Sequence, residues 1–98
     1  EHVSREEKQA FLRKLFPGCA ADQIREYILL LDAWFAAEGS LSAIAQTMFI
    51  HKNTIQYRLR RLAEITGLDV RKPSQAPALY LAMQVFLELE AAGDGLVI

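Results

Sequence analysis

The chain has 98 residues, of which 52% are hydrophobic and 23% charged, so it forms about one globular domain, which excludes a second catalytic domain and a disordered chain. Apolar runs such as residues 27–31 are much shorter than the about 18 residues of a membrane span, so no membrane partner is expected. The single cysteine, Cys19, excludes an internal disulfide. Without a Cys/His cluster, we expect a reducing, cytoplasmic setting and neither a metal nor a cofactor.

The first predicted helix has signals at both ends. Ser4 and Glu7 have the spacing of a capping box, in which a hydroxyl and a carboxylate satisfy free N–H groups at a helix start, so a helix is expected over residues 5–16. The Pro-Gly pair at 17–18 ends it. Its expected apolar stripe consists of Phe11, Leu12, Leu15 and Phe16.

Two further helices follow from their caps and breaks. Asp22 is expected to cap a helix that continues to Glu38 and ends at Gly39. Its apolar residues recur at helical spacing, which predicts a central and mostly buried helix. These residues are Ile24, Ile28, Leu30, Leu31, Trp34 and Phe35. Ser40 is expected to cap a short helix over residues 41–48.

The C-terminal half contains two longer helices. After a three-residue turn, a helix is predicted over residues 52–66, where Gly67 supplies a left-handed stop. Ser74 is expected to cap the last helix, which accepts Pro77 in its first turn and ends near Gly93. Its apolar stripe is Leu79, Met83, Phe86 and Leu87. The predicted fold is therefore all-α, a single domain of about five helices forming a small bundle.

The charge is unevenly distributed along the chain. The net charge is −1, yet residues 41–63 contain no acidic residue and carry +4, which leaves −5 for the remainder. Since salt screens charges beyond about 10 Å, local charge matters more than the total, and this block predicts an anion-binding face. A solvated helix face is the alternative, although such faces normally mix both signs. The basic residues are Lys52, Arg58, Arg60 and Arg61.

The same segment has the form of a helix-turn-helix, over about residues 41–66. Two helices of about eight and fourteen residues are joined by a turn of about three, and the small Ala45 falls where the helices cross closely. Ile55, Leu59 and Leu62, at i, i+4 and i+7, are expected to hold the second helix on the core. At about 100° per residue, the opposite side then carries Asn53, Tyr57, Arg60 and Arg61.

Duplex DNA offers two kinds of contact to this face. Phosphates attract basic side chains and accept hydrogen bonds, whereas base edges in the major groove are read by amide, hydroxyl, guanidinium and methyl groups. The start of the helix over 52–66 is expected to enter the major groove, with base contacts from Asn53, Thr54 and Tyr57. Tyr57 could instead pack its ring on the neighbouring turn. Arg58 and Arg61, about one turn further on, are expected at phosphates.

Five more residues complete the candidate interface. Ser40 and Ser42 begin the preceding helix and are candidates for a phosphate anchor. Lys52 lies within reach of the bases, and Gln56 lies on the flank of the helix. His51 either contacts DNA or only caps the helix, and it has no second ligand at i+4 that would indicate a metal site.

The sequence lacks the usual marks of an enzyme. It has no glycine-rich phosphate loop, His-Glu-x-x-His motif or nucleophile elbow, so we expect no catalytic activity. The alternative function is a helical protein interaction or dimerisation module, whose basic helix binds an acidic partner. Salt response and competition with duplex DNA separate the two readings.

The residues of this segment match a known pattern. Residues 41–45 (LSAIA), 48–59 (MFIHKNTIQYRL) and 66–69 (TGLD) closely resemble the C-terminal helix-turn-helix domain of PucR/CdaR-type bacterial transcription regulators, which is more distantly similar to the Fis-type helix-turn-helix. The resemblance covers about residues 22–87 and implies the DNA-binding output domain of a regulator. It also implies that an N-terminal domain of the parent protein senses a small molecule, so that the chain is a C-terminal fragment.

Three positions depart from common patterns. Met48 stands where the family usually has Leu, Lys52 where it commonly has Arg, and Phe49 where many other helix-turn-helix proteins have Gly. A single unit of this size contacts few base pairs, so a homodimer that reads half-sites about 34 Å apart is expected, through either the first or the last helix. The C-terminal residues 94–98 are expected to fray, and their apolar end, residues 96–98, to dock on a neighbouring subunit.

Overall fold

The computed structural model describes residues 3–93 and 95, and its regular structure is helical throughout this range. The helices, in chain order, are α1 (Arg5–Leu15), α2 (Ala21–Ala36), α3 (Leu41–Met48), α4 (Lys52–Thr66) and α5 (Ala76–Ala91). The described residues contain no strand, and the all-α prediction is confirmed. Residues 96–98, for which docking on a second subunit is predicted, lie outside the described residues.

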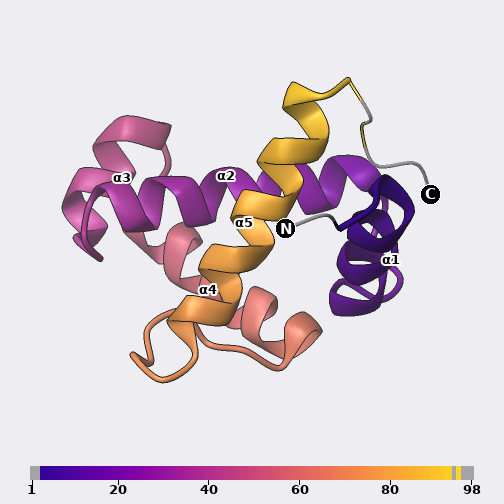
Figure 1. Ribbon diagram of the computed structural model, residues 1–98. Helices are drawn as coiled ribbons and strands as arrows, with labels where there is room; N and C mark the ends of the chain where they lie inside the picture. Colours follow the sequence, from indigo (N-terminus) through magenta and orange to yellow (C-terminus); the bar gives the residue numbers. More distant parts are fainter. Residues whose placement is uncertain (1–2, 94, 96–98) are drawn as a thin grey trace.

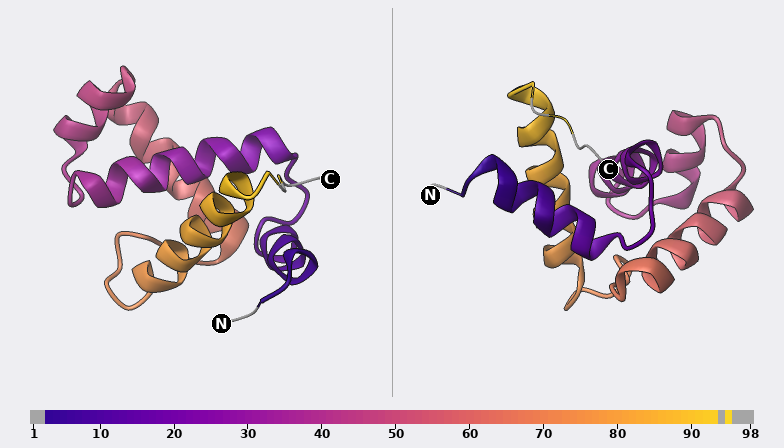
Figure 2. Two further views of the ribbon diagram at one scale, coloured as in Figure 1. Left: turned by 45° about the horizontal axis from the view of Figure 1, so that its top comes forward. Right: turned by 90° about the vertical axis from the view of Figure 1, so that its right-hand side faces the viewer.

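α2 is the central helix of the fold (Figure 1). α1 and α3 lie near opposite ends of α2, and α5 crosses α2 and also packs against α1. α3 packs against both α2 and α4. When α2 is viewed end-on, α3 and α4 lie on one side of the molecule and α1 and α5 on the other (Figure 2). This arrangement leaves one side of α4 without a covering helix.

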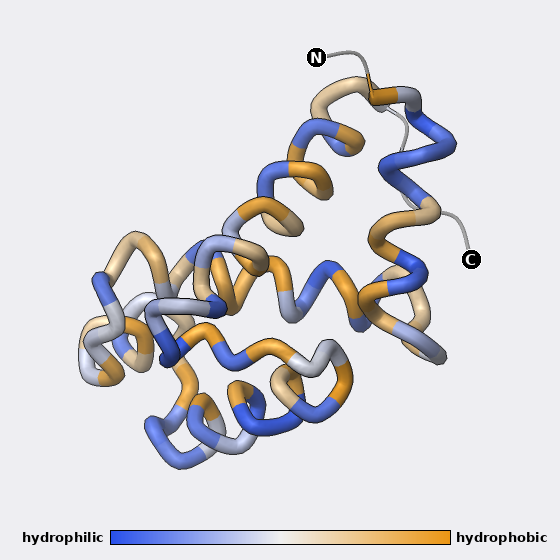
Figure 3. Tube along the Cα trace, turned by 60° about the horizontal axis from the view of Figure 1, so that its bottom comes forward, coloured by the Kyte–Doolittle hydropathy of each residue, from blue (hydrophilic) through white to orange (hydrophobic). Residues whose placement is uncertain are grey.

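The core is a single apolar cluster to which all five helices contribute. The described residues include no buried polar or charged side chain, so burial here stabilises through apolar surface alone. Phe11 and Leu87 were predicted in apolar stripes but are 38% and 40% exposed, because each lies at the margin of its helix stripe. Figure 3, in which α4 runs along the bottom, shows hydrophobic and hydrophilic stretches alternating along this amphipathic helix. The buried side chains of the helices are Leu12, Ile24, Ile28, Leu30, Leu31, Ile44, Ile55, Leu59, Leu62, Leu79, Ala82, Met83, Phe86 and Leu89.

The start of α1 confirms the predicted capping box, whereas α2 begins differently from the prediction. The Ser4 hydroxyl accepts a hydrogen bond from the Glu7 N–H at 3.1 Å, and the Ser4 N–H donates to the Glu7 carboxylate at 2.9 Å. Asp22 was predicted to cap α2, and this is wrong: Ala20 is the N-cap residue. The Gln23 side chain takes over, because its Oε1 accepts from the Ala20 N–H at 3.0 Å.

α2 is also shorter than predicted at its C-terminal end. It ends at Ala36 and not at Glu38, because Glu38 and Gly39 have positive φ angles of 51° and 81°, which reverse the chain direction toward α3. α3 and α4 have the predicted bounds. The Ser40 hydroxyl caps α3 by accepting from the Ala43 N–H at 3.2 Å, and Gly67 ends α4 with the predicted left-handed φ of 76°.

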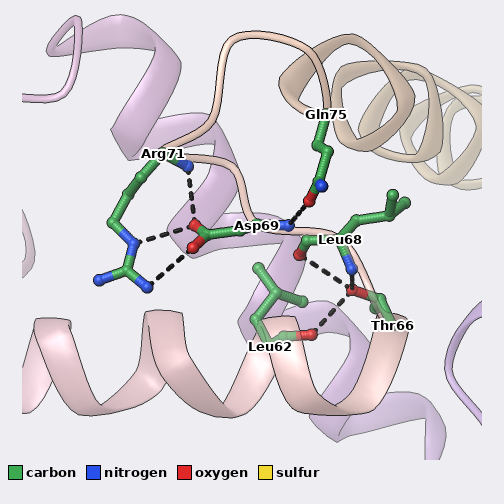
Figure 4. A network of polar contacts seen from close by, with 6 residues as sticks. All are labelled: Leu62, Thr66, Leu68, Asp69, Arg71 and Gln75. Carbon is green, nitrogen blue, oxygen red and sulfur yellow. Dashed lines mark hydrogen bonds and ion pairs between the residues drawn. The ribbon is translucent and has the colours of Figure 1, made fainter.

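The connector between α4 and α5 is built around a polar network (Figure 4). Ser74 was predicted to cap α5, but the N-cap position is held by Gln75 and has no side-chain cap bond. The Gln75 Oε1 instead accepts from the Asp69 N–H at 2.7 Å. The Asp69 carboxylate accepts from the Arg71 N–H and Nε, both at 2.9 Å, and from Nη2 at 3.0 Å. At the end of α4, the Thr66 hydroxyl donates to the Leu62 carbonyl at 2.8 Å.

Candidate nucleic-acid interface

The turn between α3 and α4 has the backbone geometry of a helix-turn-helix. Phe49 is in the left-handed conformation with φ 57°, the conformation that glycine adopts most easily. The N–H of Ile50 donates to the carbonyl of Ala45 at 3.2 Å, which closes the turn. A non-glycine residue in this conformation costs about 1–2 kcal/mol, and the Phe49 side chain is 93% exposed. The sequence signals a departure at Phe49 but does not predict its exposure.

One stripe of α4 fixes the helix to the core, as predicted. Ile55, Leu59 and Leu62 are 0%, 2% and 1% exposed. Ile44 of α3 is fully buried, and Ala45 is half-buried against the same core cluster. Because these residues occupy one side of α4, the opposite side is free to face a partner.

The predicted interface residues are accessible on that opposite side. Nine of the ten are exposed, and Arg58 is half-buried, since it lies on the flank of α4 nearer to the core. Tyr57 is 55% exposed and therefore is not packed away on its own helix. The exposed residues are Ser40, Ser42, His51, Lys52, Asn53, Thr54, Gln56, Tyr57 and Arg61.

His51 is the N-cap residue of α4. Its Nδ1 accepts a hydrogen bond from the Asn53 N–H at 3.0 Å, so the capping alternative is confirmed. In the neutral ring an accepting Nδ1 leaves the hydrogen on Nε2, which makes Nε2 a donor on an exposed side chain. Capping and contact with an external acceptor are therefore compatible in His51.

The basic side chains of α4 differ in how the chain pairs them. Arg61 Nη1 lies 2.7 Å from Glu64 Oε1, and this hydrogen bond raises the pKa of the Arg61 guanidinium above its ordinary value. Lys52, Arg58 and Arg60 have no carboxylate partner among residues 3–93 and 95. These three charges are therefore available to an external anion.

The fold also brings α2 residues to this side of α4, and no sequence pattern predicts this approach. A hollow of about 230 Å³ separates the first half of α2 from α4. Side chains of both helices line it, namely Gln23, Glu26, Tyr27, Tyr57, Arg58 and Arg61. The two groups lie 30 or more residues apart in the sequence, so only tertiary packing brings them together.

Over the described ranges, no group of three or more His, Cys, Asp or Glu side chains is arranged to hold a metal ion. In the same part of the chain, no helix has both the length and the apolar character needed to cross a bilayer.

The helix-turn-helix segment of this chain matches a known protein family. The model of the PucR C-terminal helix-turn-helix domain matches residues 27–85, which include α3, the turn and α4. The chain belongs to this family. The resemblance, which was expected to cover about residues 22–87, is thus confirmed over residues 27–85, a range that takes in most of α2 and α5.

Several curated proteins are similar to this PucR-type domain. The carbohydrate diacid regulator of Escherichia coli is 42% identical over 55 residues, which are 56% of this chain and 14% of that protein. The transcriptional activator PmfR of Paenarthrobacter nicotinovorans is 31% identical over 93 residues, which are 93% of this chain and 20% of that protein. The DNA-binding transcriptional activator AdeR of Bacillus subtilis is 27% identical over 55 residues, 56% of this chain and 13% of that protein. No solved structure gives a significant match.

Proposed function

We propose that this domain binds duplex DNA sequence-specifically, as the output domain of a bacterial transcription regulator, with α4 in the major groove. The observation that carries the proposal is the division of α4 into a buried apolar stripe and an exposed stripe of amide, hydroxyl and basic groups. Base edges and phosphates are recognised by these groups. The similar proteins are named as a regulator and as transcriptional activators, which supports a role in transcription and not in catalysis.

The length of α4 assigns different tasks to its two halves. Asn53 and Arg61 lie eight residues apart, which is about 12 Å along the helix axis. This distance is close to the width of the major groove. If Asn53 reaches base edges, Arg61 and Arg58 lie near the phosphates at the groove margin. Base contacts are assigned to Lys52, Asn53, Thr54, Gln56 and Tyr57, and phosphate contacts to Ser40, Ser42, His51, Arg58 and Arg61.

The start of α3 suits a phosphate anchor. Ser42 lies in the first turn of α3, where free N–H groups and the helix dipole favour an anion. The Ser40 hydroxyl accepts from the Ala43 N–H, so its own hydrogen is free to be donated to a phosphate oxygen.

The parent protein and its assembly extend this proposal. The chain spans only 14–20% of the carbohydrate diacid regulator and PmfR, so we assign effector sensing to an N-terminal part of a longer cytoplasmic protein. Residues 1–98 then act as its single DNA-binding domain. One unit contacts few base pairs, and a homodimer reading half-sites about 34 Å apart would supply the remaining affinity.

The first experiment is selection of bound fragments from a random duplex pool, followed by two variants on the enriched site. Asn53→Ala is expected to cost about 1–3 kcal/mol and to relax discrimination at one position. Arg61→Ala is expected to weaken all duplexes alike and to lower the salt slope by about one. Gln84→Ala removes an amide of α5 instead, where it donates to the Tyr80 hydroxyl, and should leave binding unchanged.

The outcome also decides between DNA and an acidic protein partner. Binding to duplex DNA should fall steeply with salt, and an excess of unlabelled duplex should compete. If the pool yields no enriched sequence and neither variant changes binding, the DNA proposal is wrong. Capture of an acidic protein that added duplex cannot displace would then favour the interaction module.

A further inference from the structure

The hollow between α2 and α4 adjoins the exposed stripe of α4. Its volume of about 230 Å³ is several times the ~30 Å³ that one water occupies in the liquid, so it can take a phosphate group together with water. Tyr57, Arg58 and Arg61 line it from α4, and they continue the stripe that begins at Asn53. α2, which lies outside the helix-turn-helix, supplies the opposite wall.

Gln23 presents a fixed donor on that wall. Its Oε1 is held by the Ala20 N–H at 3.0 Å, as part of the start of α2. Because the oxygen is tied to the backbone, the Nε2 group keeps both of its hydrogens for another acceptor. Gln23 is exposed, so an external group can reach this amide.

Tyr27 presents a second donor and is held more firmly. Its ring stacks on Phe16 with centroids 6.3 Å apart and an interplanar angle of 18°. Burial raises the pKa of the Tyr27 phenol above its ordinary value, although nearby Arg61 acts in the opposite direction. The hydroxyl has no hydrogen-bond partner within the described residues.

The charges around the hollow favour an anion. Arg58 is half-buried without a carboxylate partner in the described part of the chain, and Arg61 shares its guanidinium with Glu64 only. Glu26 is the carboxylate in the lining, so the lining residues carry a net charge of +1, and Glu64 lies outside the lining as the partner of Arg61. Two arginines, the Gln23 amide and the Tyr27 hydroxyl therefore belong to the lining of one hollow, and such donors suit the acceptor-only oxygens of a phosphodiester.

We propose that this hollow seats one backbone phosphate of the bound duplex, gripped by Arg58 and Arg61 from α4 and by Tyr27 and Gln23 from α2. The inference rests on the proposed function and makes α2 part of the DNA-binding surface. Because α2 is anchored in the core through Ile24 and Ile28, a contact from it fixes how far α4 enters the groove. The contact carries no sequence information itself.

The test is a set of duplexes in which one phosphate at a time is replaced by a neutral methylphosphonate. Tyr27→Phe and Arg58→Gln are each expected to weaken binding about tenfold on every natural duplex. At one phosphate position, the methylphosphonate should weaken wild-type binding about tenfold but have little further effect on either variant. Such non-additivity at a shared position shows that both side chains act on the same group.

Two more variants control for folding and for general effects. Tyr80→Phe removes a hydroxyl from α5, which does not line the hollow, and should bind like wild type. Gln23→Glu keeps an oxygen for the Ala20 N–H but replaces the donor with a negative charge, so it should weaken binding more than tenfold while α2 remains capped.

Failure of this inference differs from failure of the proposed function. If wild-type protein selects a duplex and Asn53→Ala impairs it, but Tyr27→Phe and Gln23→Glu bind normally, the phosphate seat is wrong and the DNA-binding proposal stands. Coupling of Tyr27 and Arg58 to two different phosphates would also overturn it. If no duplex is bound at all, both fall together.

Discussion

The side of the molecule around α5 and the side around α4 differ in how their basic side chains are paired. Around α5, cations of other helices are neutralised by the chain itself: Lys8 Nζ lies 3.1 Å from Glu88 Oε1, and Arg25 pairs with Glu90 through both terminal nitrogens, with Nη1 2.6 Å from Oε1. The Arg25 guanidinium also lies 5.4 Å from the centre of the Phe86 ring. These contacts join α1 and α2 to α5.

Within the described residues, the cations of α4 form no ion pair with another helix. Lys52, Arg58 and Arg60 lack a carboxylate partner in residues 3–93 and 95, and the partner of Arg61 is three residues away on the same helix. Exposed ion pairs contribute little to stability, whereas an unpaired cation gains most from an external phosphate. The pattern of pairing therefore separates charges that join helices from charges that are available for binding.

The largest expected effect is a loss of stability when a side chain is removed from the core that both sides share. Leu59→Ala removes a side chain that is 2% exposed on the inner stripe of α4, and it should lower the free energy of unfolding by about 2–5 kcal/mol. Urea denaturation measures this change. Gln56→Ala, on the exposed flank, should stay within about 0.5 kcal/mol of wild type. Equal losses in the two variants would mean that α4 has no fixed inner side.

The contrast in charge pairing is tested by removing unpaired cations of α4 in one variant and a paired cation of α2 in another. Lys52→Gln combined with Arg60→Gln should weaken binding to all duplexes on the order of tenfold and make the salt dependence of binding shallower, with unfolding free energy unchanged. Arg25→Gln should instead reduce thermal stability and leave the salt slope unchanged, because its charge is used by Glu90. A stability loss in the double variant would show that the α4 cations also serve the fold.

Local signals explain which parts of the fold were predictable. The bounds of α3 and α4, the cap at Ser40 and the stop at Gly67 depend on neighbours within four residues, and all were predicted correctly. The inner stripe of α4 was also predictable, since its spacing follows from the helix period. These features put the predicted interface residues on one face of α4 without any knowledge of the tertiary structure.

The predictions of helix starts are wrong where a different residue takes the role of the expected cap. At the start of α2, Ala20 is the N-cap residue in place of Asp22, and the Gln23 side chain accepts from the Ala20 N–H, although Asp is the more common cap residue. Ser74 makes no cap for α5, because residues 67–75 are ordered by the network around Asp69 and Gln75. The α2 wall of the hollow could not be predicted either, because its approach to Tyr57 depends on how two helices pack.

The connector offers a further example of a cation neutralised within the chain. Hydrogen bonds from the Arg71 side chain lower the pKa of Asp69 below its usual 3.8. The stability from this pair is therefore fully present above about pH 4 and is lost as pH falls through the lowered pKa of the folded state. Asp69→Asn should cost about 1 kcal/mol at neutral pH, and the difference from wild type should shrink in acid. Denaturation at pH 7 and pH 3 measures it; a difference independent of pH would show that the charge of Asp69 is not used.

The smallest effect is expected at a cation that lies on the exposed stripe of α4 and is also paired within the chain. Arg61 belongs to the exposed stripe of α4, but Glu64 neutralises it at 2.7 Å and adds a negative charge to the same side of the helix. Glu64→Gln should therefore strengthen binding to all duplexes by a few-fold and make the salt dependence of binding steeper, as measured by titration at several salt concentrations. Glu88→Gln, which releases Lys8 on the other side of the molecule, is the matched control and should leave binding unchanged. Weaker binding by Glu64→Gln would mean that the carboxylate orients Arg61 toward its phosphate. The idea that Glu64 reduces the contribution of Arg61 to DNA binding would then be wrong.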